Sequence, residues 1–357
     1  MSDLLKLLTE LVAVPAPSGY EEPMMTWCCD YFKRYTKQVE VDTRGNFYAT
    51  FPGTGKNPLR VMLAAHMDAL GFIVTGINKR GFVRFARSMM PLSMPCRRVL
   101  IHGAKGPVRG IIGTCVGYGT IPREQYSQVP PVNEMYIDLG CASDEEVKQL
   151  GIEVGQPITV ESKLDTLGNP NWIVAPALDD RAGIAALAML AVELDKLEER
   201  PEVIIVGTLE EENGLRGAGT AAFRCNPDLG FSVDTQPCAD TPEYSLEKMP
   251  VQMNKGPVIK FTEGGTKTNH PRLRQLLIDA AEKNGTRYQL AAAPVAGSDM
   301  GEIEQARAGI PAAAIGMPRR YAHTPNEVMD IRDIEDTVVI LKEAMKILGK
   351  GYSLKRI

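Results

Sequence analysis

Five separated segments of the chain carry imidazole and carboxylate groups, the side chains that most often hold catalytic metal ions. They are His66-Met67-Asp68, Asp179-Asp180, Glu210-Glu211-Glu212, Asp234 and His323. Each follows or closes a stretch with the apolar pattern of a buried strand or of a strand-to-helix turn. Catalytic side chains of open α/β sheets gather at such strand ends. The set therefore predicts a hydrolytic site with two metal ions.

Asp179 is the residue expected to bridge the two ions. A two-metal hydrolytic site needs one carboxylate shared by both ions, further ligands on each ion, and a general base beside the attacking water. Asp179 stands where the apolar segment 175–178 ends and an alanine-rich helix is expected to begin. Its carboxylate would then point into the crevice at the strand ends.

The remaining segments complete the predicted ligand set. The glutamates at 210–212 follow an apolar run, and three adjacent carboxylates repel one another by an amount that bound cations relieve. Asp234 closes another apolar run, and His323 lies in the loop after a third. Carboxylate and imidazole ligands without cysteine suit zinc, cobalt or manganese in a site with open coordination positions.

Each of these residues also has a structural interpretation when it is taken alone. A single acid at a strand end, such as Asp234, is most often a helix cap or a solvated loop residue. A glutamate cluster is usually a solvated face, and His66 alone is as often structural as a ligand. The other two histidines, His102 and His270, are expected to be structural or exposed. The joint pattern therefore carries the metal hypothesis.

The composition excludes several classes of partner. A chain of 357 residues exceeds the size at which a single core stops growing, about 250–300 residues, and so predicts two domains. A net charge of −4 with scattered Lys and Arg provides no basic surface for nucleic acid. The longest strongly apolar stretch, 182–192, is too short to cross a membrane. Residues 1–12 have the pattern of an amphipathic helix and not of a signal peptide, so a cytoplasmic location is expected.

The seven cysteines are expected to be reduced and mostly structural. No two of them have the C-x-x-C spacing of redox or metal motifs. The adjacent pair Cys28-Cys29 falls in a helical pattern, where burial is the favoured role. The cysteines are Cys28, Cys29, Cys96, Cys115, Cys141, Cys225 and Cys238.

The order of apolar patterns predicts an α/β fold, an αβα sandwich with a mainly parallel sheet. Strands are expected at 60–65, 203–209, 230–233 and 310–316, a hairpin at 39–51, and helices at 4–12, 180–197, 270–284, 299–307 and 334–348. A further helix is expected after the capping-box pattern of Ser18 and Glu21. Residues 71–160 contain short strand-like runs punctuated by Gly, Pro and Asn, which predict an inserted small β domain. The catalytic domain would then comprise residues 1–70 and 161–357.

The ordered motifs resemble the signature series of the tetrahedral (TET-type) metallo-aminopeptidases. This is the family of glutamyl and deblocking aminopeptidases, some members of which were once labelled endoglucanases. The resemblance covers almost the whole chain, and it implies a zinc-peptidase-like catalytic domain interrupted by a PDZ-like β domain used in dimerisation. It also implies dimers that assemble into a tetrahedral dodecamer. The motifs are His66-Met67-Asp68 with Gly71-Phe72, Leu178-Asp179-Asp180-Arg181, Glu211-Glu212-Asn213-Gly214-Leu215-Arg216-Gly217-Ala218, Val233-Asp234, Gly297-Ser298-Asp299 and Arg320-Tyr321-Ala322-His323-Thr324-Pro325.

The resemblance further implies which residues hold the metals. Two divalent ions, zinc or else cobalt or manganese, would share Asp179 as a bridge. His66 and Asp234 would complete one ion position, and Glu212 and His323 would complete the other. The peptide bond that follows Asp179 would be cis, as in similar enzymes.

By the same resemblance, Glu211 would act as general base on a water that bridges the metals. Asp68 would hydrogen-bond the far nitrogen of His66 and fix its tautomer. The implied reaction is hydrolysis of the first peptide bond of a peptide with a free amino terminus, which an open coordination position would hold. Two positions depart from the family pattern: Ala69 stands where similar sequences have a glutamate, and Asn213 replaces a common valine.

Two other functions stay open at this stage. A deacylase or carboxypeptidase-like hydrolase on a similar two-metal scaffold would act on N-acyl amino acids. A non-catalytic assembly protein would keep the metal site for structure alone. A glycosidase rests only on the paired carboxylates and needs neither imidazole nor metal. Candidates for the pocket of the first side chain, with surface exposure as the alternative for each, are Lys260, Glu263, Lys267 and Arg320.

Overall fold

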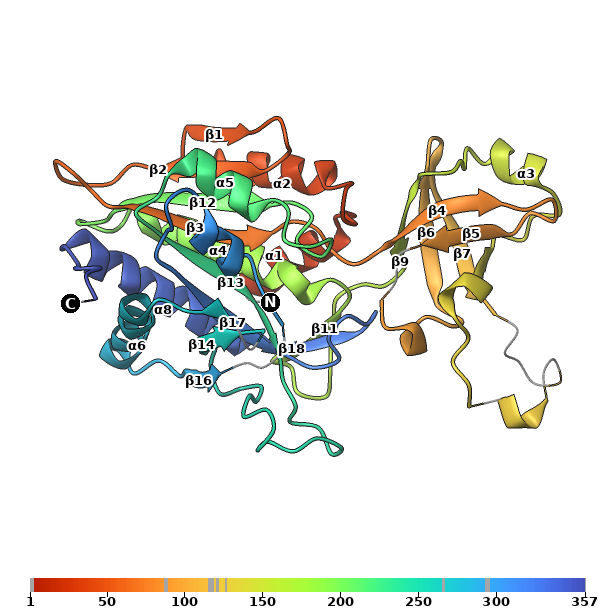
Figure 1. Ribbon diagram of the computed structural model, residues 1–357. Coiled ribbons are helices and arrows are strands. Elements are labelled where there is room, and N and C mark those ends of the chain that lie inside the picture. The colour runs from red at the N-terminus through yellow and green to blue at the C-terminus, as the bar shows by residue number, and fades with distance from the viewer. Residues whose placement is uncertain are drawn as a thin grey trace.

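The computed structural model describes residues 3–86, 89–114, 119, 122–125, 127–264, 267–292 and 296–356. The strands of its main sheet are β1 (Gln38–Val41), β2 (Phe47–Phe51), β3 (Arg60–His66), β12 (Glu202–Thr208), β13 (Leu229–Pro237), β14 (Val258–Glu263), β15 (Lys267–Thr268), β16 (Gln289–Ala292) and β17 (Ala312–Arg319). They are ordered β1-β2-β12-β3-β13-β17-β14-β15, and β16 also pairs with β14. The central strands β12, β3, β13 and β17 run parallel (Figure 1). The prediction of an α/β fold with a mainly parallel central sheet is confirmed.

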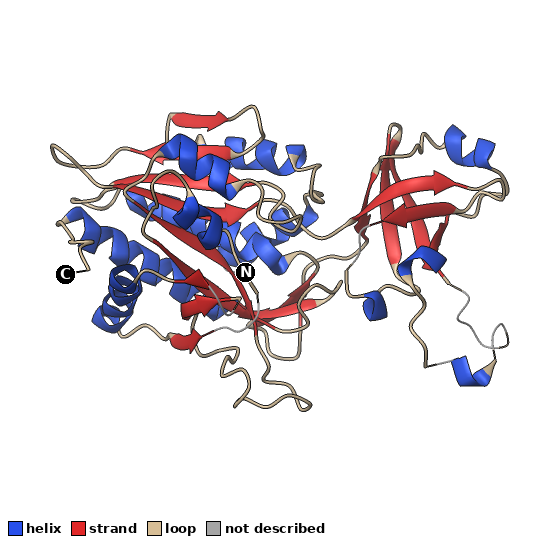
Figure 2. Ribbon diagram, viewed as in Figure 1, coloured by secondary structure: helices blue, strands red, loops and turns tan. Residues whose placement is uncertain are grey.

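Helices cover both faces of this sheet (Figure 2). Side chains alternate between the faces of a strand, so Val61 and Leu63 of β3 belong to one core, and Met62 and Ala64 to another. The first core lies under α1 (Asp3–Ala13), α2 (Glu22–Phe32), α4 (Leu178–Leu194), α6 (Pro271–Asn284) and α8 (Ile331–Gly349). The second lies under α5 (Ala218–Cys225) and α7 (Met300–Gln305). No helix within the described ranges is long and apolar enough to cross a membrane.

A closed β barrel lies beside the main body (Figure 1). Its strands follow one another as β4-β5-β8-β7-β6-β9 around an apolar core of its own. They are β4 (Phe72–Ile77), β5 (Val83–Ala86), β6 (Arg98–Gly103), β7 (Gly106–Gly113), β8 (Tyr136–Asp138) and β9 (Pro157–Val160), with α3 (Asp144–Gln149) and 3₁₀ turns at Pro91–Ser93, Arg123–Gln125 and Val132–Glu134. The chain therefore leaves the main sheet after β3, completes the barrel, and returns to the main sheet afterwards.

A small antiparallel sheet lies next to the start of α4. It consists of β10 (Asp165–Thr166), β11 (Trp172–Ala175) and β18 (Glu327–Asp330). Because β11 leads directly into α4, and β18 follows the loop of His323, this sheet connects two segments that were predicted to carry ligands.

The expected capping box from Ser18 to Glu21 at the start of α2 is wrong, because the N-cap of this helix is Glu21, whose side chain makes no capping hydrogen bond. The hydroxyl of Ser18 donates instead to the carboxylate of Asp68, at 2.7 Å. Oε1 of Glu21 accepts from the main-chain N–H groups of Gly19 and Glu210, at 2.8 and 3.1 Å. The charged Asp68 acceptor is stronger than a neutral partner, so Ser18 is drawn toward the strand ends and away from the helix.

Several boundaries also differ from those expected. The long helix α4 begins at Leu178 and ends at Leu194, with non-helical backbone angles at Asp179 and Asp180. The predicted helix at 299–307 is shorter, and the strand at 230–233 continues to Pro237. All six described cysteines are free thiols, and Cys115 lies outside the described residues.

Close packing of α4 on the sheet yields a stability prediction. A Cβ atom added at Gly183 would lie 2.5 Å from the main-chain oxygen of Val233 and would collide with the carboxylate of Asp180. We expect Gly183→Ala to destabilise the protein by about 1–3 kcal/mol, since overpacking displaces both groups. Urea unfolding followed by circular dichroism measures the change.

Gly219→Ala is the matched control. Gly219 lies in α5, where an added Cβ would meet its nearest neighbour at 3.6 Å, an ordinary contact. Alanine has the higher helix propensity, so this variant should be stabilised by up to about 1 kcal/mol. Equal unfolding midpoints for the two variants would contradict the packing argument.

Candidate metal centre

Neighbouring strand ends and the start of α4 bring the predicted site residues together. His66 is the last residue of β3 and lies opposite Thr208, the last residue of β12. The glutamates at 210–212 follow β12, and His323 lies between β17 and β18. Asp234 lies within β13 and does not close it, because β13 continues beside β17. Parallel strands present their carboxyl ends at one edge, which explains the convergence.

The carboxylate of Asp179 is at the centre of the cluster. Its Oδ1 lies 3.3 Å from Nε2 of His66, and its Oδ2 lies 3.3 Å from Nε2 of His323. The same nitrogen of His323 lies 3.6 Å from Oε2 of Glu212. The peptide bond between Asp179 and Asp180 is cis, as the resemblance implied. Three overlapping groups have ligand atoms within 4.8 Å of one another: His66, Asp179 and Asp234; His66, Glu211 and Glu212; and Asp179, Glu212 and His323.

Asp68 holds both His66 and the glutamate segment in position. Nδ1 of His66 lies 3.1 Å from the carbonyl oxygen of Asp68 and 3.3 Å from its Oδ1. With Nδ1–H donating to these oxygens, Nε2 is the nitrogen directed toward Asp179 and is the one that a metal ion could bind. The Asp68 carboxylate also accepts from the main-chain N–H groups of Glu211 and Glu212, at 3.0 and 3.1 Å. Asp68 therefore orients two of the predicted ligands and the predicted base.

Burial makes Glu211, Glu212 and Asp234 difficult to ionise. At Asp179, by contrast, the charge of Arg319 and the two histidines outweigh burial and hold the pKa well below its ordinary value. Burial and the charge of Asp179 raise the pKa of Glu212 to about 8 and that of Asp234 to about 7. Burial also raises the pKa of Glu211 well above its ordinary value, and the charge of Asp234 adds to the rise. One oxygen of Glu212, Oε1, is buried without a hydrogen-bond partner among the described residues.

This environment fits a divalent cation. A cation relieves the repulsion between buried carboxylates and binds lone pairs that hydrogen bonds leave free, such as that of Glu212 Oε1. Carboxylate oxygen and imidazole nitrogen, without sulfur, form a donor set suited to zinc, cobalt or manganese. The first ligand group could hold one ion and the third group another, with Asp179 common to both.

Sequence reasoning missed a buried arginine at the edge of the cluster. Arg319 ends β17, and its Nη2 lies 2.7 Å from Oδ2 of Asp179. Its Nη1 donates to the buried carboxylate of Glu327. Glu327 also accepts from the main-chain N–H groups of Asp179 and His323, at 3.1 and 2.9 Å. The sequence offers only one sign of this arginine, which is the Arg319-Arg320 pair at the end of an apolar run. Because successive side chains of a strand point to opposite faces, one of the two arginines had to point inward.

The candidates for the first side-chain pocket do not line the cavity that opens onto the cluster. The alternative prediction, that these residues are exposed on the surface, is wrong for Lys260 and Glu263. Both side chains are fully buried, and Nζ of Lys260 lies 2.7 Å from Oε1 of Glu263. Arg320 is mostly buried and pairs with Asp240 at 2.8 Å. Lys267 is partly exposed. Within the described part of the chain, none of these four lines the cavity at the acidic cluster.

A cavity of about 530 Å³ opens onto the cluster. Its lining includes Asp179, Glu211, Glu212, Asp234, Arg319 and His323. Met90, from the barrel segment between β5 and β6, also lines it, and its main-chain N–H donates to the carbonyl oxygen of His323 at 3.1 Å. The barrel thus contacts the loop that carries one predicted ligand.

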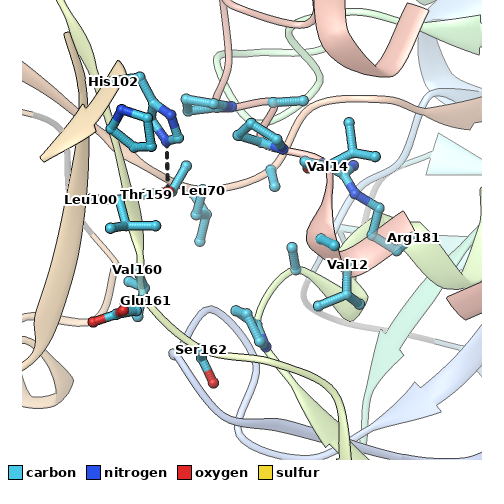
Figure 3. A pocket seen from close by; sticks show the side chains of 18 of the residues that line it. Val12, Val14, Leu70, Leu100, His102, Thr159, Val160, Glu161, Ser162 and Arg181 are labelled. Atoms are coloured by element: carbon cyan, nitrogen blue, oxygen red, sulfur yellow. Dashed lines mark hydrogen bonds between the residues drawn. The ribbon is translucent and has the colours of Figure 1, made fainter. Parts of the chain in front are cut away.

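A second cavity, of about 450 Å³, lies between the main body and the barrel (Figure 3). Apolar side chains such as Val12, Leu70 and Leu100 make up much of its lining. His102 from β6 lines it on the barrel side, where its Nε2 lies 2.8 Å from the hydroxyl of Thr159 in the neighbouring strand β9. None of the predicted metal ligands lines this cavity within the described ranges, whereas several of them line the first one.

Comparison with known proteins identifies the family of this chain. The family model described as M42 glutamyl aminopeptidase matches residues 45–340. The chain belongs to the M42 peptidase family. It is 35% identical to a relative in Acetivibrio thermocellus that bears an aminopeptidase name, over 97% of this chain and 98% of that one. The resemblance noted in the sequence is confirmed, and the chain is a peptidase.

The fold of this M42 peptidase is similar to that of solved TET peptidases. It matches a TET aminopeptidase from a marine sediment archaeon of the Thaumarchaeota with a TM-score of 0.91 and 27% identity, covering 98% of this chain and 99% of that one. The TET1 peptidase of Pyrococcus horikoshii matches with a TM-score of 0.85 and 26% identity, over 96% and 99% of the two chains. That protein can assemble into a tetrahedron or a large octahedral shell.

The raised pKa values predict how the metal-free M42 peptidase responds to pH. The folded-state pKa of Glu212 is about 8 and the ordinary value is 4.5, so between these the folded state holds more protons than the unfolded state. Stability therefore falls as the pH rises through this interval. His66 also makes the stability fall as the pH rises. Burial lowers the pKa of His66, but the charge of Glu211 and the hydrogen bond with Asp179 outweigh burial and raise this pKa well above 6.5.

Thermal unfolding of chelator-treated protein measures this effect. We expect a melting temperature several degrees lower near pH 8 than near pH 5, as a change of about 1 kcal/mol shifts it by a few degrees. Added divalent ion should remove most of the difference, and Glu212→Gln should reduce it without metal. A metal-free melting temperature that does not fall between these pH values would contradict the electrostatic account.

Proposed function

We propose that this peptidase is an aminopeptidase with two divalent metal ions that removes single residues from the free amino terminus of peptides. The observation that carries the proposal is the membership of Asp179 in two ligand groups, one with His66 and Asp234 and one with Glu212 and His323. A carboxylate in that position suits a bridge between two ions. Zinc fits the donor set, with cobalt or manganese as alternatives.

Glu211 is the general base in this proposal. Two divalent ions held by the ligand groups would supply Lewis acidity toward a peptide carbonyl and an attacking water. Glu211 lines the cavity, and its Oε2 lies 3.9 Å from Nε2 of His66, so it faces the centre of the cluster. It accepts a proton from water as the new C–O bond forms. It then donates that proton to the amine as the C–N bond breaks.

Substrate selection follows from the coordination positions that the protein ligands would leave open. Each ligand group offers three protein donors with Asp179 shared, so an ion held there could also bind the free amino group of a peptide terminus, whose lone pair an acylated nitrogen lacks. This preference separates an aminopeptidase from the deacylase-like alternative. It also accounts for cleavage next to the terminus, because the amino group is held beside the reacting bond.

The barrel has a separate role in the proposal. We assign residues 71–160 as a PDZ-like insertion that joins two chains, with dimers assembling into a tetrahedral dodecamer. Support comes from the TET1 peptidase of Pyrococcus horikoshii, which matches over 99% of its length and can form a tetrahedron. The barrel is also built separately from the main sheet, with its own apolar core, so its outer surface is available for such contacts.

Replacement of the base tests the mechanism. We expect Glu211→Gln to lower kcat by about 10²–10⁴-fold, the usual contribution of a general base, while metal content stays unchanged. Steady-state kinetics and elemental analysis measure the two quantities. Glu210→Gln is the matched control, since Glu210 pairs with Arg44 at 3.0 Å, outside the cluster, and this variant should retain activity. Wild-type turnover by metal-loaded Glu211→Gln would exclude Glu211 as the base.

Paired substrates test the reaction class. We expect leucine or glutamate p-nitroanilide to be hydrolysed and the N-acetylated forms to resist. A chelator should abolish hydrolysis, and added zinc, cobalt or manganese should restore it, because the ligand groups bind no substrate carbonyl on their own. Preference for the acetylated forms would favour the deacylase alternative. Metal binding without hydrolysis of a broad peptide panel would favour a non-catalytic assembly protein.

A further inference from the structure

The two ligand groups around Asp179 contain the same kinds of donor. Each consists of two carboxylates and one imidazole: His66, Asp179 and Asp234 in one, and Asp179, Glu212 and His323 in the other. Equal donor sets predict similar intrinsic affinities for a given divalent ion. Any difference between the two positions must therefore come from their surroundings.

The two oxygens of the Asp179 carboxylate have different surroundings. Oδ1, which faces His66, accepts a hydrogen bond from the neutral hydroxyl of Thr235 at 3.0 Å. Oδ2, which faces His323, lies 2.7 Å from the guanidinium of Arg319. An arginine stays protonated at any accessible pH, so Oδ2 already carries a fixed positive partner and Oδ1 does not.

Arg319 cannot move away from this position without cost. Its side chain is 2% exposed, and its Nη1 is held by Glu327, which is itself buried. Its Nε is also buried and has no partner among the described residues, so the contacts with Asp179 and Glu327 are the ones that hold the guanidinium. An ion on the His323 side would have to share Oδ2 with this group and would be repelled by its charge.

Exposure adds to the difference. The side chain of His66 is 2% exposed, and that of His323 is 46% exposed. Water therefore competes for the ligand positions more easily on the His323 side.

We propose that Arg319 makes the two metal positions unequal, so that the position of His66, Asp179 and Asp234 binds its ion tightly and the position of Asp179, Glu212 and His323 binds an exchangeable one. The inference rests on the proposed two-metal function and assigns to Arg319 a positioning role toward Asp179. The guanidinium of Arg319 is a fixed monovalent cation that partly neutralises the carboxylates in place of the ion on the His323 side. The concentration of free metal then determines whether the position of Asp179, Glu212 and His323 is occupied.

Metal titration of the whole protein tests this inference. Chelator-treated wild-type protein is titrated with zinc or manganese alone by calorimetry, and elemental analysis after gel filtration gives the ions retained per chain. We expect two separate steps and one retained ion for the wild type. Arg319→Gln should bring the two dissociation constants closer by about tenfold or more and raise retention toward two ions, because a repulsive charge is removed. Circular dichroism confirms that the variant is folded.

Two further variants keep the result interpretable. Arg319→Lys retains the positive charge and should keep two unequal steps. Arg320→Gln removes the neighbouring arginine, which pairs with Asp240 away from the cluster, and should titrate as the wild type does. If Arg319→Gln fails to fold, the wild-type titration still decides, since a single step with two equal ions overturns the inference. That result leaves the proposed function intact, whereas a wild type that binds no ion at all overturns the function itself.

Discussion

Repulsion between buried carboxylates is the constraint on which the rest of this structure depends. Asp179, Asp234, Glu211 and Glu212 lie close together at one edge of the sheet, and burial with mutual repulsion disfavours the charged form of most of them. Such a cluster persists only if positive charge compensates it. Arg319 supplies a permanent part of that charge at Oδ2 of Asp179, and the imidazoles of His66 and His323 face Oδ1 and Oδ2. The arrangement is costly for a metal-free chain and suitable for one that binds cations.

The scaffold holds this cluster through main-chain contacts more than through side-chain packing. Asp68 accepts the N–H groups of Glu211 and Glu212, and Glu327 accepts those of Asp179 and His323. Asp68 therefore ties the end of β3 to the segment after β12, and Glu327 ties the start of α4 to the loop of His323. These anchoring residues are buried, and they lie beside the parallel strands. The register of those strands is fixed because their side chains alternate between the two cores on opposite faces of the sheet. The geometry of the cluster thus follows from the fold.

The sequence was sufficient for the broad fold and for the residues that converge, because their types recur at the ends of apolar runs. It was not sufficient for partners chosen by tertiary contacts. Ser18 matches a helix cap, but a charged acceptor 50 residues away is a stronger partner. Lys260 and Glu263 look like surface residues until the fold buries them as a pair. Arg319 and Arg320 are adjacent and identical, so only the strand's position decides which one faces the acidic cluster.

The hydrogen bond from Met90 to the carbonyl oxygen of His323 has a consequence for how this protein can be divided. A residue from the barrel supports the backbone of a loop more than 200 positions later in the chain. Excising the barrel and joining its flanks would leave that carbonyl without its donor and open one wall of the cavity. The main body alone would therefore lack one donor to the loop of His323, and exchanging barrels between relatives would require the donor to be rebuilt at the same place.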